Sequence, residues 1–393
     1  LLKGWISLIL RKDCCFHQCN CGNVLVFPGE YSHWLNMRVI LEELVERNHS
    51  VTVLVSTASP SINFSRPESF GFKVYDVPFE KQDWQALKED LINWWLNESQ
   101  KVSMLQLGLW IRDFLQKMNV LTVNMCKSMF NNEEHLESLR QSKFDALLSD
   151  PMFPCSDLIA DALDLPLIFS LRFSFGMVIE RQCAQVPAPS SYVPSPELPY
   201  TDKMNCVNSV YMYISLVNKC SDSDSLHVSG SPTRFCELMG KADIWLIRTY
   251  WDIEYPRPFL PNFKFVGGLH CKPAKPLSED MEEFVQSSGD DGIVVFSLGS
   301  MVKNLTTERG NAVATALGRI PQKVSLVLFA SGFPSKNGPI YVHYALFGAL
   351  PKALVKSSAL YREYRNREPI LGLCLGCYIK SNQMYLYSPS YIS

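Results

Sequence analysis

The sequence predicts an α/β fold in which a parallel sheet is flanked by helices. The first observation is a strand, a helix and a strand in succession near the N-terminus, and the second is a set of later apolar runs typical of buried strands. β-branched runs such as residues 51–55 (VTVLV) are typical of strands buried on both faces of a parallel sheet. The third observation is size, because 393 residues, 47% of them hydrophobic, are enough for two domain cores.

The first unit of this fold spans residues 22–55. An apolar run from Val24 to Phe27 predicts a strand that ends at a Pro-Gly pair. From Met37 to Val45, apolar residues recur at the i, i+3, i+4, i+7 and i+8 spacing of a helix with one buried face. The VTVLV run follows as the second strand and completes a βαβ unit. No GxGxxG pattern follows the first strand, so the usual dinucleotide-binding fingerprint is missing.

His33 is predicted to lie in the loop between the first strand and the helix. In open parallel sheets, ligands bind at the edge formed by the carboxyl ends of the strands. A histidine at that edge can act as a general base, because imidazole takes up a proton near physiological pH. Packing or capping of the helix start is the alternative interpretation, and position alone does not separate the two.

A strand is predicted from Phe72 to Val77, and the region from Trp84 to Arg140 then follows a mainly helical pattern. Core packing is the expected role of its large apolar side chains, because apolar residues at helical spacing usually face a core. The functional alternative is that they line an apolar pocket beside the ligand-binding edge. The side chains concerned are Trp94, Trp95, Leu105, Leu109, Trp110, Phe114 and Leu115.

A second candidate residue, Asp150, follows a short buried strand predicted at Ala146 to Leu148, and a helix is predicted from Ser156 to Leu163. Asp150 is thus expected at the same sheet edge as His33, where a carboxylate can orient an imidazole and stabilise the imidazolium. A local Asp-Pro turn or helix cap is the alternative interpretation.

Further buried strands are predicted at Leu167 to Leu171, Ala242 to Ile247 and Gly292 to Leu298. Arg248 directly follows the second of these strands. Ser300 follows the third in a Gly-Ser turn, which can offer donors to a phosphate but is equally an ordinary tight turn. The proline-rich run from Pro256 to Pro276 is expected to connect two domains.

Composition argues against some classes of partner. A net charge of −2 offers no electrostatic reason to expect a nucleic acid or an anionic surface as partner. No apolar run reaches the about 18 residues that a membrane-spanning helix needs, so no membrane span is expected in this chain. The total of 13 cysteines is odd, which leaves at least one thiol unpaired within the chain.

Residues 1–21 are expected to form an atypical N-terminal segment. Its start, LLKGWISLIL, resembles the apolar part of a signal peptide. The cysteines from Cys14 to Cys21, with His17, match no standard zinc spacing, so the end of a secretory leader is the preferred interpretation and no metal site is expected. Glycosylation triplets that permit a secretory compartment begin at Asn48, Asn63, Asn97 and Asn304.

Several long motifs carry a resemblance to a known family. They are EYSHWLNMRVILEELVERNHSVTVL, SDPMFPCSDLIADAL, the stretch from ELMGKADIWLIR to HCKPAKPL, and VVFSLGSMVKNLT. In this order, over about residues 22–324, they resemble the vertebrate UDP-glucuronosyltransferases. The resemblance implies a GT-B type fold of two Rossmann-like halves, with the acceptor bound in the first half and the UDP-sugar mainly in the second.

The resemblance also implies a reaction. A glucuronosyl group would pass from UDP-glucuronic acid, a co-substrate used without a further cofactor, to a hydroxyl of a small lipophilic acceptor, with inversion. His33, in SHW, resembles the base that deprotonates the acceptor, and Asp150, before PMFPC, resembles its partner. Ser300, in FSLGS, resembles an early part of the donor site, and Arg248 is assigned to the same cleft. The resemblance further implies a membrane glycoprotein on the lumenal side of the endoplasmic reticulum that serves detoxification. It also implies homo- or hetero-oligomers with family members.

The departures from the family pattern divide the chain into expected domains. These are an atypical segment at 1–21, an acceptor-binding Rossmann-like domain at 22–290, the start of a donor-binding domain at 291–324 and a divergent tail at 325–393. The family's histidine- and glycine-rich donor signature and its membrane anchor have no match here, so an incomplete second half is expected. The alternatives to an active enzyme are a catalytically inactive truncated form that pairs with full-length relatives, and a fragmentary translation without a stable product.

Overall fold

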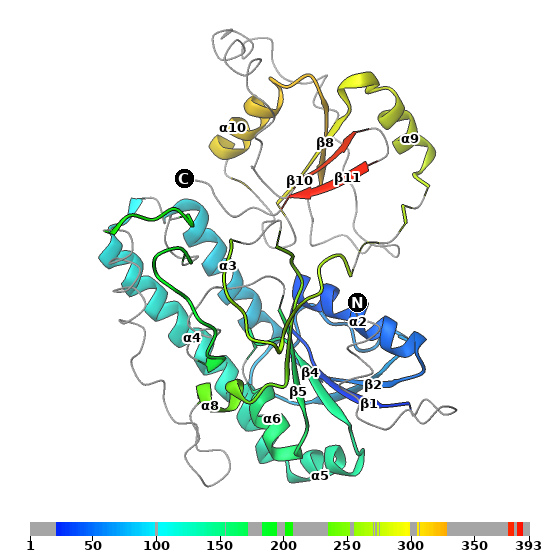
Figure 1. The fold of residues 1–393 in the computed structure, drawn as a ribbon, viewed down its shortest axis with the longest axis vertical. Helices are drawn as coiled ribbons and strands as arrows, with labels where there is room; N and C mark the ends of the chain where they lie inside the picture. Colours follow the sequence, from blue (N-terminus) through cyan, green and yellow to red (C-terminus); the bar gives the residue numbers. More distant parts are fainter. Residues whose placement is uncertain are drawn as a thin grey trace. The chain divides into compact units, whose positions relative to one another are not determined.

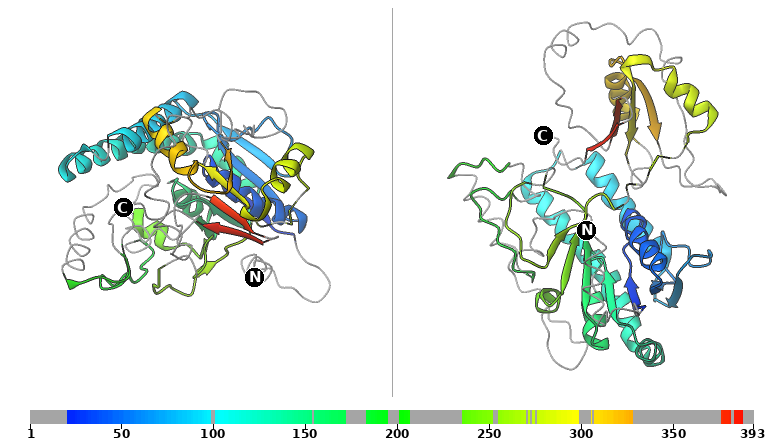
Figure 2. Two further views of the ribbon diagram at one scale, coloured as in Figure 1. Left: turned by 90° about the horizontal axis from the view of Figure 1, so that it is seen from above. Right: turned by 45° about the vertical axis from the view of Figure 1, so that its right-hand side comes forward.

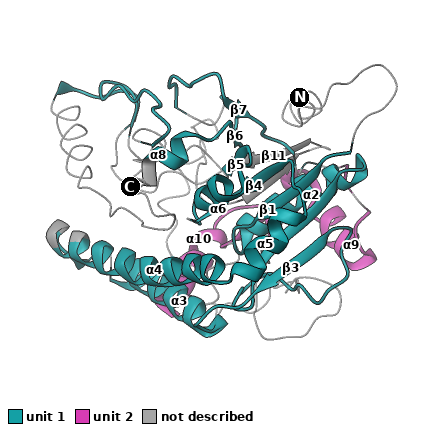
Figure 3. Cartoon of the chain, turned by 90° about the horizontal axis from the view of Figure 1, so that it is seen from below, with its two compact units in different colours: residues 1–271 teal, residues 272–393 magenta. Residues whose placement is uncertain are grey.

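The computed structural model divides the chain into two compact units, residues 1–271 and 272–393, which Figure 3 colours separately. The domain boundary expected at residues 290 and 291 stays a prediction. The structure describes residues 21–98, 101–153, 155–171, 183–194, 201–206, 235–251, 255–269, 271, 273–274, 276–298, 305, 307–327, 376–380 and 383–387.

The first unit is built on a seven-stranded sheet in the order β3-β2-β1-β4-β5-β6-β7 (Figure 1). Every neighbouring pair is parallel, which confirms the predicted α/β class with a Rossmann-like sheet flanked by helices. The chain runs outward from β1 to β3 and then returns to the other side of β1 as β4, so the strand order reverses between β1 and β4. The strands are β1 (Asn23–Phe27), β2 (Ser50–Ser56), β3 (Gly71–Tyr75), β4 (Ala146–Ser149), β5 (Leu167–Leu171), β6 (Ile244–Ile247) and β7 (Phe263–Phe265).

Helices cover both faces of this sheet because successive side chains of each strand point to opposite faces (Figure 2). Leu25 of β1 belongs to the hydrophobic cluster that contains Met129 of α4 and Ile159 of α6. Its neighbour Val26 belongs to the cluster on the other face, which contains Leu41 of α2. The helices of this unit are α2 (Ser32–Glu46), α3 (Lys81–Asn97), α4 (Met104–Asn131), α5 (Glu133–Gln141), α6 (Ser156–Leu163) and α8 (Phe235–Gly240).

The apolar stripe predicted for the first helix is confirmed, since Met37, Ile40, Leu41 and Leu44 of α2 are all buried. Burying one such side chain fully stabilises the fold by about 1.5–3 kcal/mol. This stripe presses α2 onto β1 and β2, and the start of the helix is thereby held at the carboxyl ends of these strands.

Core packing was expected for the large apolar side chains named above on α3 and α4, but none of those that the structure describes is buried. Trp95 is 63% exposed and Leu115 is 50% exposed, while Trp94 stacks on Trp110 across the helix pair with ring centroids 3.9 Å apart. The reason is length. A helix of 28 residues extends about 42 Å, whereas a strand of 5 residues extends only about 17 Å. Only the second half of α4, where Met125 and Met129 are buried, reaches the core.

The proline-rich run from Pro256 to Pro276, expected to connect two domains, contains the boundary between the two units after Cys271 and also contributes a strand to the first unit. This run contains β7, whose Phe263 is buried and stacks on Trp245 of β6 with ring centroids 5.0 Å apart. The prolines flank the strand rather than interrupt it, as suits an edge strand. The segment up to Cys271 is therefore part of the first unit.

The second unit contains a four-stranded sheet in the order β11-β10-β8-β9. β8 and β9 pair in parallel across α10, which makes a second βαβ unit and confirms the strand expected at Gly292 to Leu298. β10 pairs with β8 and β11 in antiparallel fashion. The elements are α9 (Glu279–Gln286), η3 (Gly289–Asp291), β8 (Ile293–Ser297), α10 (Thr307–Leu317), β9 (Lys323–Val327), β10 (Gly376–Lys380) and β11 (Gln383–Tyr387).

None of the helices in the described part of the chain is both long and apolar enough to cross a lipid bilayer.

Asp157, in the first turn of α6, is a buried acid in the core of the first unit. Its Oδ1 accepts a hydrogen bond from the backbone N–H of Cys155 at 3.3 Å, whereas its Oδ2 has no hydrogen-bond donor among the described residues. Burial raises the pKa of the Asp157 carboxyl to about 6, because loss of water disfavours the charged form. The ionised side chain therefore destabilises the fold at neutral pH.

The substitution Asp157→Asn is expected to raise the melting temperature at pH 7 but not at pH 4. The folded-state pKa of about 6 lies above the ordinary value of 3.8, so the charge costs stability fully above pH 6 and the cost vanishes as the pH falls below 3.8. The difference corresponds to about 3 kcal/mol at pH 7. Thermal melts of the two proteins at both pH values test this.

Asp164→Asn is the matched control, because Asp164 ends the same helix in an exposed position. It should change the melting temperature little at either pH. If Asp157→Asn raised the melting temperature by the same amount at pH 4 and at pH 7, the predicted titration of Asp157 would be contradicted.

Candidate active site at the switch point of the sheet

The site lies where β1 and β4 end side by side. Phe27 and Ser149, the last residues of these strands, are paired in the parallel register. The segments that follow them therefore leave the same edge of the sheet as neighbours. Because the strand order reverses between β1 and β4, this is also the point at which open α/β sheets bind ligands.

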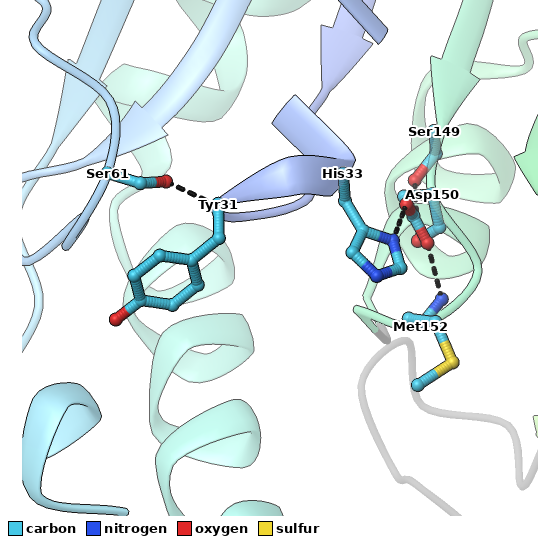
Figure 4. A network of polar contacts seen from close by, with 6 residues as sticks. All are labelled: Tyr31, His33, Ser61, Ser149, Asp150 and Met152. Carbon is cyan, nitrogen blue, oxygen red and sulfur yellow. Dashed lines mark hydrogen bonds and ion pairs between the residues drawn. The ribbon is translucent and has the colours of Figure 1, made fainter. Parts of the chain in front are cut away.

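His33 and Asp150 meet at this point; their positions in the sequence predicted the same sheet edge for both but not the contact between them. His33 belongs to the first turn of α2 rather than to the preceding loop, because the helix begins at Ser32. Its Nδ1 lies 2.6 Å from Oδ2 of Asp150, and Figure 4 shows the two side chains facing one another. A separation this short is typical of a charge-assisted hydrogen bond.

The carboxylate of Asp150 is fixed by its own loop as well. Its Oδ1 accepts a hydrogen bond from the backbone N–H of Met152 at 3.0 Å, and its backbone carbonyl accepts one from Phe153 at 3.1 Å. The local turn that was the alternative interpretation is thus present together with the contact to His33. Asp150 is 3% exposed, so this carboxylate has little freedom to move away from the imidazole.

The contact with Asp150 determines what the imidazole can do. A carboxylate beside Nδ1 favours the tautomer that carries its proton there, and the other ring nitrogen is then a proton acceptor. Figure 4 shows this second nitrogen of His33 pointing away from Asp150. The arrangement is suited to general-base chemistry, in which the buried carboxylate stabilises the imidazolium that forms.

Gly29 is a site residue that the sequence analysis did not single out. A Cβ atom at this position would lie 2.7 Å from Cβ of His33 and 2.9 Å from Oδ2 of Asp150. Both distances are shorter than van der Waals contact allows, so any side chain would push the pair apart. The Pro-Gly break after the first strand was the available signal for this close approach.

Glu30 connects the segment carrying His33 to the loop after β2. Its carboxylate accepts hydrogen bonds from the hydroxyl of Ser59 at 2.8 Å, from the backbone N–H of Ser61 at 3.2 Å and from the hydroxyl of Ser61. Ser61 Oγ in turn accepts a bond from the backbone N–H of Tyr31 at 2.6 Å (Figure 4). Tyr31 has a φ of 54°, a region that bulky residues rarely adopt, and these bonds hold it there.

A small pocket, open to solvent, lies beside the pair. Phe153 links the two, since its ring makes edge contacts with His33 at 6.2 Å and with Trp84 at 6.4 Å between centroids. Of the helical region expected to pack or line a pocket, Trp84 of α3 and Met125 of α4 do contribute here. The lining residues are Phe27, Pro28, Glu30, Leu54, Val55, Ser56, Tyr75, Trp84, Met125 and Phe153.

A disulfide joins Cys126 of α4 to Cys155, which directly precedes α6. Both cysteines are buried, and each lies close in the chain to a pocket residue, Met125 and Phe153 respectively. The bond therefore ties the loop that carries Asp150 to α4. No spacing rule could have shown this pairing in advance, because connectivity among many cysteines cannot be deduced from sequence.

Of the other predicted site residues, the structure describes Arg248, which lies two strands away from β4. Arg248 follows β6 at the same sheet edge, and its backbone N–H donates to the carbonyl of Leu171 at 2.9 Å, but β5 lies between its strand and β4. Ser300 lies outside the described residues, as do Cys14 and His17 of the cysteine-rich segment. Within the part that the structure describes, no group of three His, Cys, Asp or Glu side chains could hold a metal ion.

Comparison with known proteins gives relatives of known activity. UDP-glucuronosyltransferase 2A3 of Cavia porcellus is 46% identical over 343 residues, which cover 85% of this chain and 64% of that protein. UDP-glucuronosyltransferase 2A1 of Rattus norvegicus is 46% identical over 317 residues, 77% of this chain and 59% of the relative. The chain therefore spans about 60% of the length of these curated relatives.

The solved structure of Arabidopsis thaliana UGT89C1 is similar with a TM-score of 0.45 and 15% identity, covering 81% of this chain and 68% of that one. The family model described as UDP-glucoronosyl and UDP-glucosyl transferase matches residues 22–337, further than the 324 expected from the motifs. Because this match covers most of the sequence, the chain belongs to the UDP-glucoronosyl and UDP-glucosyl transferase family.

Proposed function

We propose that this chain takes part in glucuronosyl transfer from UDP-glucuronic acid to a hydroxyl of a small lipophilic acceptor. The observation that carries the proposal is the hydrogen bond of 2.6 Å between His33 and Asp150 at the switch point of the sheet. An apolar pocket opens next to this pair, and the relatives at 46% identity are UDP-glucuronosyltransferases. The acceptor would lie in the pocket with its hydroxyl toward His33.

The mechanism follows from the geometry of the pair. The second ring nitrogen of His33 takes the proton of the acceptor hydroxyl, and Asp150 stabilises the imidazolium that results. The acceptor oxygen then forms a bond to the anomeric carbon of the donor sugar from the side opposite to UDP. The bond from that carbon to the UDP oxygen breaks with its electron pair, so UDP leaves and the anomeric centre is inverted.

For the donor sugar nucleotide, only two contacts are proposed. Ser300 and Arg248 are proposed contacts of UDP-glucuronic acid, since Arg248 lies at the same edge of the first sheet as the pair. A UDP leaving group is stabilised by cationic and backbone donors, and this reaction class needs no redox cofactor.

An oxidising compartment fits the chain, and we place it at the lumenal side of the endoplasmic reticulum. The Cys126–Cys155 disulfide supports this placement, because structural disulfides persist in secretory compartments and are rare in the cytosol. Exposed Asn63 begins a glycosylation triplet that would be used there. We also propose that the protein associates with a membrane, that it serves detoxification, and that it forms homo- or hetero-oligomers with family members.

The alternative is a catalytically inactive chain that acts as an interaction partner of full-length relatives. It predicts that the folded chain binds a phenolic acceptor but forms no glucuronide. The active form predicts both binding and product. Mass spectrometry of the full chain incubated with UDP-glucuronic acid and 1-naphthol separates these outcomes, and absence of acceptor binding would contradict both.

Replacing the base is expected to abolish most of the transfer. In His33→Ala, kcat/KM for 1-naphthol should fall by about 10²–10⁴-fold, because a positioned general base contributes a factor of this size. His49→Ala is the control, since His49 lies at the other end of α2 and contacts the backbone N–H of Gly22. Turnover of His33→Ala within about threefold of the unmodified chain would show that His33 is not the base.

Gly29→Ala is expected to lose activity without losing the fold. The added methyl group would displace His33 or Asp150, and a shift of about 1 Å at reacting groups costs about 10²-fold in rate. Gly71→Ala is the matched control, because a Cβ there meets only the carbonyl of Val51 at 3.9 Å. Steady-state kinetics with circular dichroism test this, and equal activity of both variants would contradict the steric argument.

A further inference from the structure

We propose that Glu30 determines acceptor specificity, so that the pocket rejects anionic acceptors and admits neutral or amine-bearing ones. This inference rests on the proposed function, because it assigns the pocket to the acceptor. It concerns a residue that the mechanism above does not use. The proposal requires that the carboxylate faces the pocket, that it stays there, and that no fixed cation cancels its charge.

Glu30 is the acidic residue in the lining of a pocket in which most of the other lining residues are apolar. Its neighbours there include the aromatic rings of Tyr75, Trp84 and Phe153. An apolar wall lowers the local dielectric, so a charge on it acts on a bound molecule far more strongly than it would in water. Glu30 follows directly on Gly29, and its backbone carbonyl accepts a hydrogen bond from the backbone N–H of His33 at 3.0 Å.

The three donors from Ser59 and Ser61 hold the carboxylate in this position. Donors to a carboxylate favour its charged form, whereas burial disfavours it, and burial is the larger effect on the pKa of Glu30, which is raised. The serine hydroxyls also occupy the lone pairs of Glu30. A bound acceptor therefore meets the carboxylate mainly as a charge and not as a free acceptor of hydrogen bonds.

The charged and titratable groups around Glu30 do not neutralise it. Lys81 acts on Glu30 from the start of α3, but it is exposed and solvent screens its charge. Tyr75 and Tyr31 are neutral, since burial and then the charge of Glu30 raise the pKa of both phenols well above the ordinary value. An acceptor carboxylate in this pocket would therefore face a like charge with little compensation.

The test is calorimetric titration of the full chain at pH 8 with single-ring phenols that differ in one group. The matched pair is 4-hydroxyphenylacetate, which is anionic, and 4-hydroxyphenylacetamide, its neutral counterpart of the same shape, with tyramine as the cationic member. The expected result is that the amide and the amine bind at least tenfold more tightly than the anion. Equal binding of anion and amide would overturn the proposal.

The variant Glu30→Gln removes the charge and keeps the shape. It should bring the ratio between amide and anion to within about threefold of unity. Glu46→Gln is the control, because Glu46 is exposed at the end of α2 away from the pocket, and it should keep the full ratio. An unchanged ratio in Glu30→Gln would overturn the proposal.

Glu30→Asp is a second variant, for use if Glu30→Gln does not fold. It keeps the negative charge and should therefore keep the discrimination against the anionic phenol. Loss of discrimination in folded Glu30→Asp would count against a charge effect. Failure of the proposed function would be visible separately, as absence of binding for the neutral amide itself.

Discussion

The site depends on one hydrogen bond at the carboxyl edge of the first sheet, between His33 after β1 and Asp150 after β4. The parallel register of these strands brings the two segments together, and the absence of a side chain at Gly29 lets them approach. The buried stripe of α2 fixes the helix that carries the imidazole. The register of the sheet, the position of α2 and the lack of a side chain at Gly29 all determine this contact. A change in any of them alters the orientation of the imidazole.

Several residues around this contact destabilise the folded state, and the rest of the first unit offsets this cost in free energy. Tyr31 and Cys155 both have positive φ values, of 54° and 108°, and such conformations cost about 1–3 kcal/mol each. Glu30 and Asp157 are acids whose burial raises their pKa values, so both disfavour the folded state when ionised. Two hydrophobic clusters, one on each face of the sheet, supply the opposing free energy.

Sequence reasoning reached the sheet and placed His33 and Asp150 at one edge of it, because periodicity identifies elements and the edge rule says where their ends lie. Val24 to Phe27 and Ala146 to Leu148 were predicted as strands, and parallel pairing then put the residues after them together. Sequence reasoning failed for Trp95 on α3, which is exposed. Whether such a side chain is buried depends on how far the helix extends beyond its neighbours, and periodicity does not show this. Gly29, Glu30 and the Cys126–Cys155 bond were missed because tertiary contacts over many residues define them.

The protonation of the His33 ring tests the central claim most directly. Nitrogen NMR of the chain labelled with 15N only in histidine, with His33→Gln to assign the signal, shows which ring nitrogen carries the proton in the neutral form. The hydrogen bond to Asp150 predicts the proton on Nδ1, with Nε2 left as the acceptor that faces away from the carboxylate. A neutral His33 protonated at Nε2 would contradict it, because the ring could then not accept a proton from a bound hydroxyl.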